Sequence, residues 1–130
     1  MASMKVFAVT VSFVMALSAC APAIRVQSAQ MATSTAPQQL VRVVDPVVIR
    51  LSTGYSREVH AGSTWRSVGV LPQGMVFRPV GTVFTIEGRQ MHEAYLVINA
   101  NTLVGFFLPG ESSFSALEPS QPIKIERIND

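Results

Sequence analysis

Two histidines, His60 and His92, and a small set of carboxylates are the residues of this chain that could support acid–base or nucleophilic catalysis. Hydrolysis by a serine, a histidine and an acid needs the histidine within hydrogen-bond reach of the serine, and an acid that orients the imidazole ring. The acids that could orient a histidine are Asp45, Glu58, Glu87 and Glu93. None of these candidates lies in a nucleophile elbow or a similar motif, so the sequence does not predict a hydrolase of this kind.

The same residues give little basis for a metal site. Glu58 and His60 are two positions apart and would share one face of a strand, whereas His92 and Glu93 are adjacent and would point to opposite faces. Two ligands do not make a metal site. Glu87 and Glu93 fit solvent-facing positions better than a glycosidase pair, and the sequence has no glycine-rich phosphate loop. We therefore expect no enzymatic activity, no metal and no cofactor.

Residue types that anchor protein interfaces are better represented. Tyr55 stands at a turn between two β-rich runs, and Trp65 and Arg66 open the next run. Tryptophan, tyrosine and arginine are enriched among the side chains that dominate binding energies, and the arginine fork suits bidentate contact with carboxylates. These three residues are candidate interface residues, with the alternative that Trp65 is simply the largest residue of the core.

A doubly apolar hairpin follows later in the chain. Residues 94–98 and 103–108 are continuously apolar, although successive residues of a strand point to opposite faces of a sheet. A sheet with one wet face would alternate apolar and polar residues, so both faces of this hairpin must be covered. Either the domain's own segments cover them, or a partner does. In the second case Phe106 and Phe107 would contact the partner.

The elements that must position these residues are predicted to be strands. Short β-rich runs alternate with turn signals such as Gly54-Tyr55 and Asn99-Ala100-Asn101, and no stretch after residue 20 has apolar residues at helical spacing over three turns. The pattern predicts an all-β domain, a small antiparallel meander that forms a barrel or a sandwich. It leaves room for a short helical turn around Ser112 to Leu117. The predicted strands cover residues 47–53, 56–60, 65–70, 75–78, 82–86, 91–98, 102–108 and 122–127.

The N-terminal region predicts export and a lipid anchor. Lys5 precedes an apolar run that is too short to cross a hydrocarbon core, which needs about 20 residues, and the run ends in Leu17-Ser18-Ala19-Cys20. This tetrapeptide resembles the lipobox of bacterial lipoproteins, in which the cysteine becomes the new N-terminus. The resemblance implies a helical signal peptide at 1–19, a thioether-linked diacylglycerol on Cys20 and an acyl chain such as palmitate on its amine. A plain secretory signal is the alternative.

Residues 20–39 contain a single charge, Arg25, and neither glycine nor an aromatic residue. Such a segment has too little apolar surface to offset its ordering entropy, so we expect a disordered, flexible tether that spans about 25 Å. The alternative is that Ile24 and Val26 add a strand to a partner's sheet. Residues 40–130 then form a single β-domain.

The lipobox resemblance implies an outer-membrane lipoprotein that faces the periplasm, because Ala21 rather than aspartate follows Cys20. We expect its β-domain to bind other envelope proteins, as an accessory structural subunit of a secretion or conjugation type of assembly. The alternatives are a stand-alone binder or inhibitor of a hydrolase such as lysozyme, and an envelope enzyme that uses His60 or His92. Ten basic and eight acidic residues give a net charge of +2, without the clustered basic face that nucleic acid binding requires.

Overall fold

The computed structural model describes residues 22–129, in which strands and turns alternate and no helix occurs. The all-β prediction is confirmed. The signal peptide predicted at 1–19 and the lipidation site predicted at Cys20 lie outside the described residues. The strands are β1 (Gln27–Ser28), β2 (Leu40–Val43), β3 (Val47–Arg50), β4 (Ser56–Val59), β5 (Thr64–Leu71), β6 (Gly74–Pro79), β7 (Thr85–Glu87), β8 (Met91–Glu93), β9 (Tyr95–Asn99), β10 (Thr102–Leu108), β11 (Ser113–Pro122) and β12 (Ile125–Ile128).

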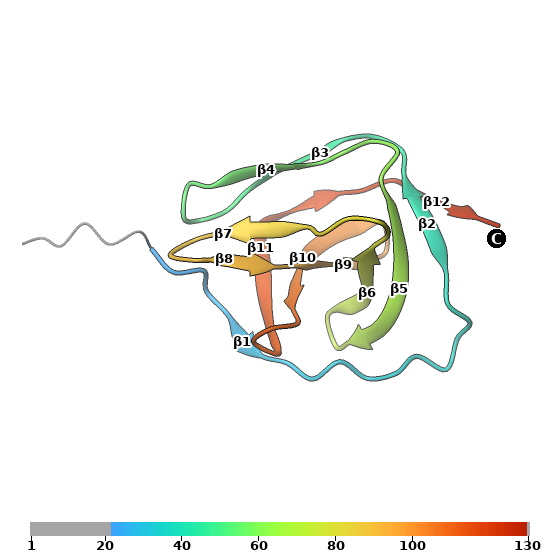
Figure 1. Ribbon diagram of the computed structural model, residues 1–130, viewed down its shortest axis with the longest axis horizontal. Coiled ribbons are helices and arrows are strands. Elements are labelled where there is room, and N and C mark those ends of the chain that lie inside the picture. Colours follow the sequence, from blue (N-terminus) through green and yellow to red (C-terminus); the bar gives the residue numbers. More distant parts are fainter. Residues whose placement is uncertain (1–21, 130) are drawn as a thin grey trace, which may run out of the picture.

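One antiparallel sheet contains eight of these strands, in the order β1-β11-β10-β9-β6-β5-β2-β12. From β5 to β11 the strands of this sheet are neighbours in sequence order, as a meander requires, with the β7–β8 hairpin inserted between β6 and β9. The other two pairs, β3–β4 and β7–β8, are separate hairpins (Figure 1). The predicted antiparallel meander is therefore present.

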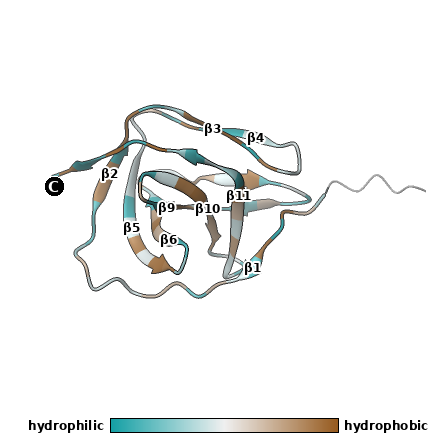
Figure 2. Ribbon diagram, turned by 180° about the vertical axis from the view of Figure 1, so that it is seen from behind, coloured by the Kyte–Doolittle hydropathy of each residue, from teal (hydrophilic) through white to brown (hydrophobic). Residues whose placement is uncertain are grey.

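The C-terminal strands β11 and β12 connect the two sides of the sheet, because they lie second and last in its order. β11 pairs with β10, and β12, which follows β11 after a short link, pairs with β2 at the other end of the order. The link is held from both sides, because the Ile123 amide donates to the Asn101 carbonyl over 3.0 Å and the Val44 amide donates to the Lys124 carbonyl over 2.9 Å. Register shifts in the β5–β6 and β9–β10 pairs add curvature. The result is a strongly curved, barrel-like sheet (Figure 2).

The inner face of the curved sheet is the main core. The two hairpins lie over it and bury Ile49 and Ile86 completely. Three aromatic rings run through its centre: the Phe84 ring lies 5.5 Å from that of Trp65 and 6.4 Å from that of Phe106, between ring centroids. Burial of this much apolar surface is the main source of the stability of the fold.

The outer face of the sheet carries a second, smaller apolar cluster that contains Val76, Val97, Phe107 and Phe114. Part of it is covered by the chain that precedes β2, since β1 pairs with the start of β11 and Ala29 packs against the cluster. Both faces of the doubly apolar hairpin are thus covered by the protein itself. This is the first of the two alternatives that the sequence left open.

Residues 22–39 are mostly exposed, as the predicted tether would be, but they contact the domain at several points. The Ala29 amide donates to Ser112 O over 3.0 Å, and Ala32 and Val70 exchange two backbone hydrogen bonds of 2.9 Å. Met31 packs so closely on Gly69 that a methyl group added to this glycine would lie 2.4 Å from the Met31 side chain. Backbone pairing, which composition does not report, attaches this segment to its own sheet rather than to a partner's.

Three local predictions need correction. The helical turn around Ser112 to Leu117 is wrong: these residues enter β11, where Phe114 pairs with Phe107, and a short apolar run cannot be told from a helix by its periodicity. The strand predicted at 91–98 is divided into β8 and β9, because the buried Ala94 bonds to Phe84 O over 2.8 Å and the chain there changes sheets. Strand β2 was not predicted, although its Leu-Val-Arg-Val sequence alternates.

Candidate functional site

The two phenylalanines proposed as partner contacts are core residues. Phe106 is 0% exposed in the inner core, and Phe107 is 5% exposed in the outer cluster. Adjacent positions on a strand face opposite sides, so β10 places one ring on each face of the sheet. Neither ring offers a surface to another protein, because the chain itself covers both.

The other three candidate interface residues do not form one patch. Trp65 is buried against Phe84, and its indole Nε1 donates to Ser63 Oγ over 3.0 Å. Tyr55 is half-buried at the turn of the β3–β4 hairpin, packed against the inner core. Arg66 is half-buried on β5, opposite Arg78 of β6. The alternative reading of Trp65 as a core residue is therefore correct for most of its ring.

One cavity does reach Trp65, and we call it the base pocket because it lies between the bases of the two hairpins. Its volume is about 230 Å³. The β3–β4 hairpin and the turn after it supply one wall, the chain just before β7 supplies another, and Trp65 and Pro79 come from the main sheet. The lining residues are Arg57, Glu58, Val59, His60, Ser63, Thr64, Trp65, Pro79, Thr82, Val83 and Phe84.

Arg57 is the unusual residue of the base pocket. Its guanidinium carbon lies 4.5 Å from the centroid of the Phe84 ring, a cation–π contact, and its Nη1 donates to Thr85 Oγ1 over 3.3 Å. Its Nε is buried and has no hydrogen-bond partner. No ion pair between Arg57 and a carboxylate is found among residues 22–129. A buried, unpaired donor of this kind costs about 1–3 kcal/mol, so a carboxylate that reached it would be bound favourably.

The two histidines are far from equivalent. His60 lies at the rim of the base pocket, exposed, with its Nδ1 3.7 Å from a Glu58 carboxylate oxygen. His92 is buried, and its Nδ1 lies 2.6 Å from Glu111 Oε1 in the turn between β10 and β11. Glu111 was not among the acids considered from the sequence, because it is 19 positions away and only the fold brings it to His92. In the described part of the chain, no group of three or more histidine, cysteine or acidic residues could hold a metal ion.

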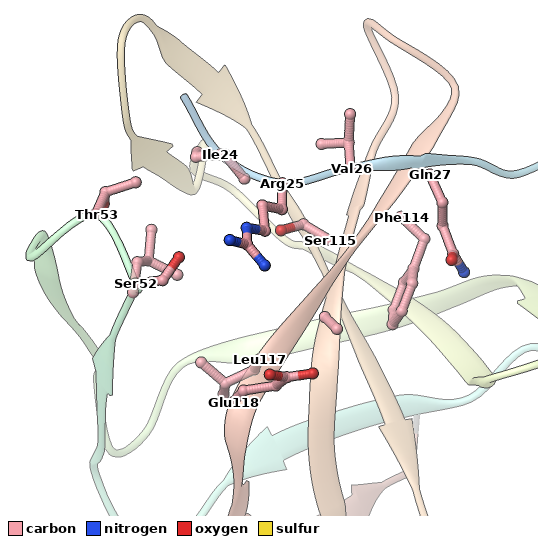
Figure 3. A pocket seen from close by; sticks show the side chains of 12 residues that line it. Ile24, Arg25, Val26, Gln27, Ser52, Thr53, Phe114, Ser115, Leu117 and Glu118 are labelled. Carbon is pink, nitrogen blue, oxygen red and sulfur yellow. The ribbon is translucent and has the colours of Figure 1, made fainter. Parts of the chain in front are cut away.

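A second cavity of about 240 Å³ lies at the opposite end of the hairpins, and we call it the tip groove. The N-terminal segment, the turn after β3 and strand β11 enclose it. Arg25 lines it from the N-terminal segment and Glu118 from β11, with Ser52 and Thr53 from the turn (Figure 3). Ile24, which the sequence offered as part of a strand for a partner, is instead buried in the inner core of its own chain.

Comparison with known proteins gives no relative for this fold. Neither the protein-family models, nor the curated proteins, nor the solved structures contain a match to the chain. Between residues 22 and 129 there is no helix long and apolar enough to cross a membrane.

Proposed function

We propose that this protein is an outer-membrane lipoprotein that is anchored through Cys20, faces the periplasm and binds other envelope proteins through its β-domain, without enzymatic activity. The observation that carries the proposal is the Leu17-Ser18-Ala19-Cys20 motif directly after an uncharged apolar run. We infer the role of an accessory structural subunit in a secretion or conjugation type of assembly.

The base pocket is the surface that best suits a protein partner. Nη1 of Arg57 donates to Thr85 Oγ1 and Nε is buried without a partner, so an incoming carboxylate would bind this edge of the guanidinium once the side chain swings toward the pocket opening. Arginine forks bind carboxylates in a bidentate manner, and arginine and tryptophan in a confined pocket are typical anchors of interfaces. The apolar walls from Pro79 and Val83 suit an apolar side chain beside that carboxylate. We propose that a partner inserts an aspartate, a glutamate or a C-terminal carboxylate here.

The native mass of the protein in a mild-detergent extract of its host's membranes tests the proposal. We expect a mass far above that of the single chain, and loss of that complex in Arg57→Met, which keeps the side-chain stem but removes the fork. Arg50→Met is the matched control, because Arg50 is an exposed arginine of the same hairpin outside the pocket, and it should leave the complex intact.

Two outcomes would count against this function. A monomeric mass for the unaltered protein would favour the stand-alone binder, and assays of lysozyme inhibition would follow. A Cys20→Ser protein that stays in the membrane fraction would contradict the lipid anchor.

A further inference from the structure

Ile24 attaches the start of the described chain to the tips of both hairpins. Its side chain is 9% exposed and belongs to the inner core. A methyl group added to Gly88, in the β7–β8 turn, would lie 2.7 Å from Ile24 Cγ1, and Ile24 lines the tip groove together with Leu51 of the β3–β4 turn. The chain is therefore held at this end of the domain from residue 24 onward.

The spacing between this attachment and the lipidation site sets a distance limit. Cys20 precedes Ile24 by four residues, and an extended chain spans at most about 3.5 Å per residue. The acylated residue that the proposed function requires would then lie within about 14 Å of Ile24. The predicted tether cannot hold the domain away from the bilayer by its whole length, because residues 24–39 run along the domain instead.

The end of the domain that carries Ile24 has side chains suited to a lipid surface. We call it the tip end: residues 24–26, 51–55 and 87–91, which lie on one side of the molecule, opposite the C-terminus (Figure 1). Arg25 and Arg89 are exposed there. Val26 is 50% exposed and Met91 is 64% exposed. Glu87 is the one acidic residue of these ranges.

We infer that the tip end rests on the phospholipid headgroups, with Arg25 and Arg89 on phosphate groups and Met91 and Val26 at the boundary of the acyl chains. Arginine binds phosphate through its fork, and basic residues near an anionic bilayer are attracted to it; exposed apolar side chains gain by entering the interface. The inference rests on the proposed lipidation of Cys20. It also orients the molecule, because the base pocket lies one hairpin length, about 13 Å, further from the membrane and faces the periplasm.

A spin label measures this orientation directly. Cys20 is the only cysteine of the chain, and in the acylated protein its sulfur is in the thioether, so an introduced cysteine is the only thiol to react. The lipidated full chain is reconstituted into vesicles of phosphatidylethanolamine and phosphatidylglycerol and labelled with a nitroxide after Met91→Cys. The matched control is Ala61→Cys, at an exposed turn beside the base pocket. We expect the label at 91 to collide with oxygen from the lipid phase at least about threefold more often than the label at 61, and with a water-soluble nickel reagent correspondingly less.

The possible outcomes distinguish failure of the proposed orientation from failure of the proposed lipid anchor. If the protein sediments with the vesicles but both labels are equally accessible from water, the anchor holds and the proposed orientation is wrong. If the protein does not become acylated or does not sediment, the proposed function itself fails. A label at 61 that is deeper than the label at 91 would mean that the domain is inverted.

Discussion

Phe106 and Phe107 are neighbours in β10, yet different parts of the chain bury them. Phe106 lies in the inner core, stacked on Phe84 and enclosed by the curved sheet and two hairpins. Phe107 lies in the outer cluster beside Tyr95, with ring centroids 6.2 Å apart, and close to where the N-terminal segment crosses the sheet. The inner face is thus closed mainly by residues 40–129, with Ile24 added from the N-terminal segment, whereas the outer face depends in part on the middle of that segment, around Ala29.

We therefore expect the inner-core contacts to determine the stability of the domain, and the contacts of the N-terminal segment to determine how that segment is attached. Loss of inner-core contacts should unfold the domain, since both hairpins and every strand of the sheet except β1 contribute residues to this core. Loss of the contacts made by residues 22–39 should instead detach this segment from the domain while the barrel persists, because those contacts are few and local. The following substitutions test whether the contacts on the inner face and those on the outer face are lost independently of each other.

The largest effect is expected from the two phenylalanines. Phe106→Ala should lower the free energy of unfolding by about 3–5 kcal/mol, since the rigid inner core leaves a cavity behind. Phe107→Ala should cost about 3 kcal/mol, at the lower end of that range, because the N-terminal segment can settle into the space. Urea denaturation followed by tryptophan fluorescence measures both values. A larger loss for Phe107 would mean that the outer cover is as rigid as the core.

The sequence predicted that both faces of the hairpin at 94–108 are covered, but not which elements cover them. Continuous apolar residues at 94–98 and 103–108 required burial on both faces, and the turn signals placed most of the strands. The attachment of the N-terminal segment was missed because it depends on backbone hydrogen bonds at Ala29 and Ala32 and on one isoleucine, Ile24, that enters the inner core. A composition argument averages over the segment and hides such sites.

For the candidate site, the sequence could indicate residue types but not which positions the fold brings together. Trp65 and Arg66 were singled out as interface types, which stays a prediction, and the contact of Arg57 with Phe84 joins two hairpins that are distant in the sequence. The contact between His92 and Glu111 is likewise produced by the fold. Side-chain pairs of this kind follow from topology, and no local pattern encodes them.

Ile24→Ala tests whether the tip end holds the N-terminal segment. We expect a loss of about 2 kcal/mol in the free energy of unfolding, because the side chain is buried at the edge of the core rather than at its centre. The same change should make residues 22–26 susceptible to limited proteolysis in the otherwise folded protein. Val26→Ala, at an exposed position two residues further on, should leave both the stability and the cleavage rate unchanged.

Gly69→Ala tests the contacts of the middle of the N-terminal segment, because Gly69 lies directly under Met31 and Ala32. The added methyl group would lie 2.4 Å from Met31 Cγ and 2.8 Å from the Ala32 carbonyl oxygen, so the segment must lift. We expect a global loss of only about 1 kcal/mol, with much faster hydrogen exchange of the Ala32 amide than in the unaltered protein. Gly110→Ala, which meets no atom within 4 Å, is the control. Equal acceleration at the Ala94 amide of the inner face would show that the two covers unfold together.

The smallest effect is expected at the turn between β10 and β11, which contacts both the β7–β8 hairpin and the N-terminal segment. On one side of this turn Glu111 accepts the hydrogen bond of His92 from the β7–β8 hairpin, and on the other side the Ser112 carbonyl accepts the Ala29 amide of the N-terminal segment. A double-mutant cycle of His92→Gln and Glu111→Gln should give a coupling of at most about 1 kcal/mol, because Glu111 is partly exposed and water screens the contact. Both Glu111→Gln and His92→Gln could speed hydrogen exchange of the Ala29 amide to the same extent. In that case the turn couples the hairpins over the inner core to the N-terminal segment over the outer cluster. If only unfolding stability changes, the covers are independent and the anchor-side segment can detach without loosening the hairpins.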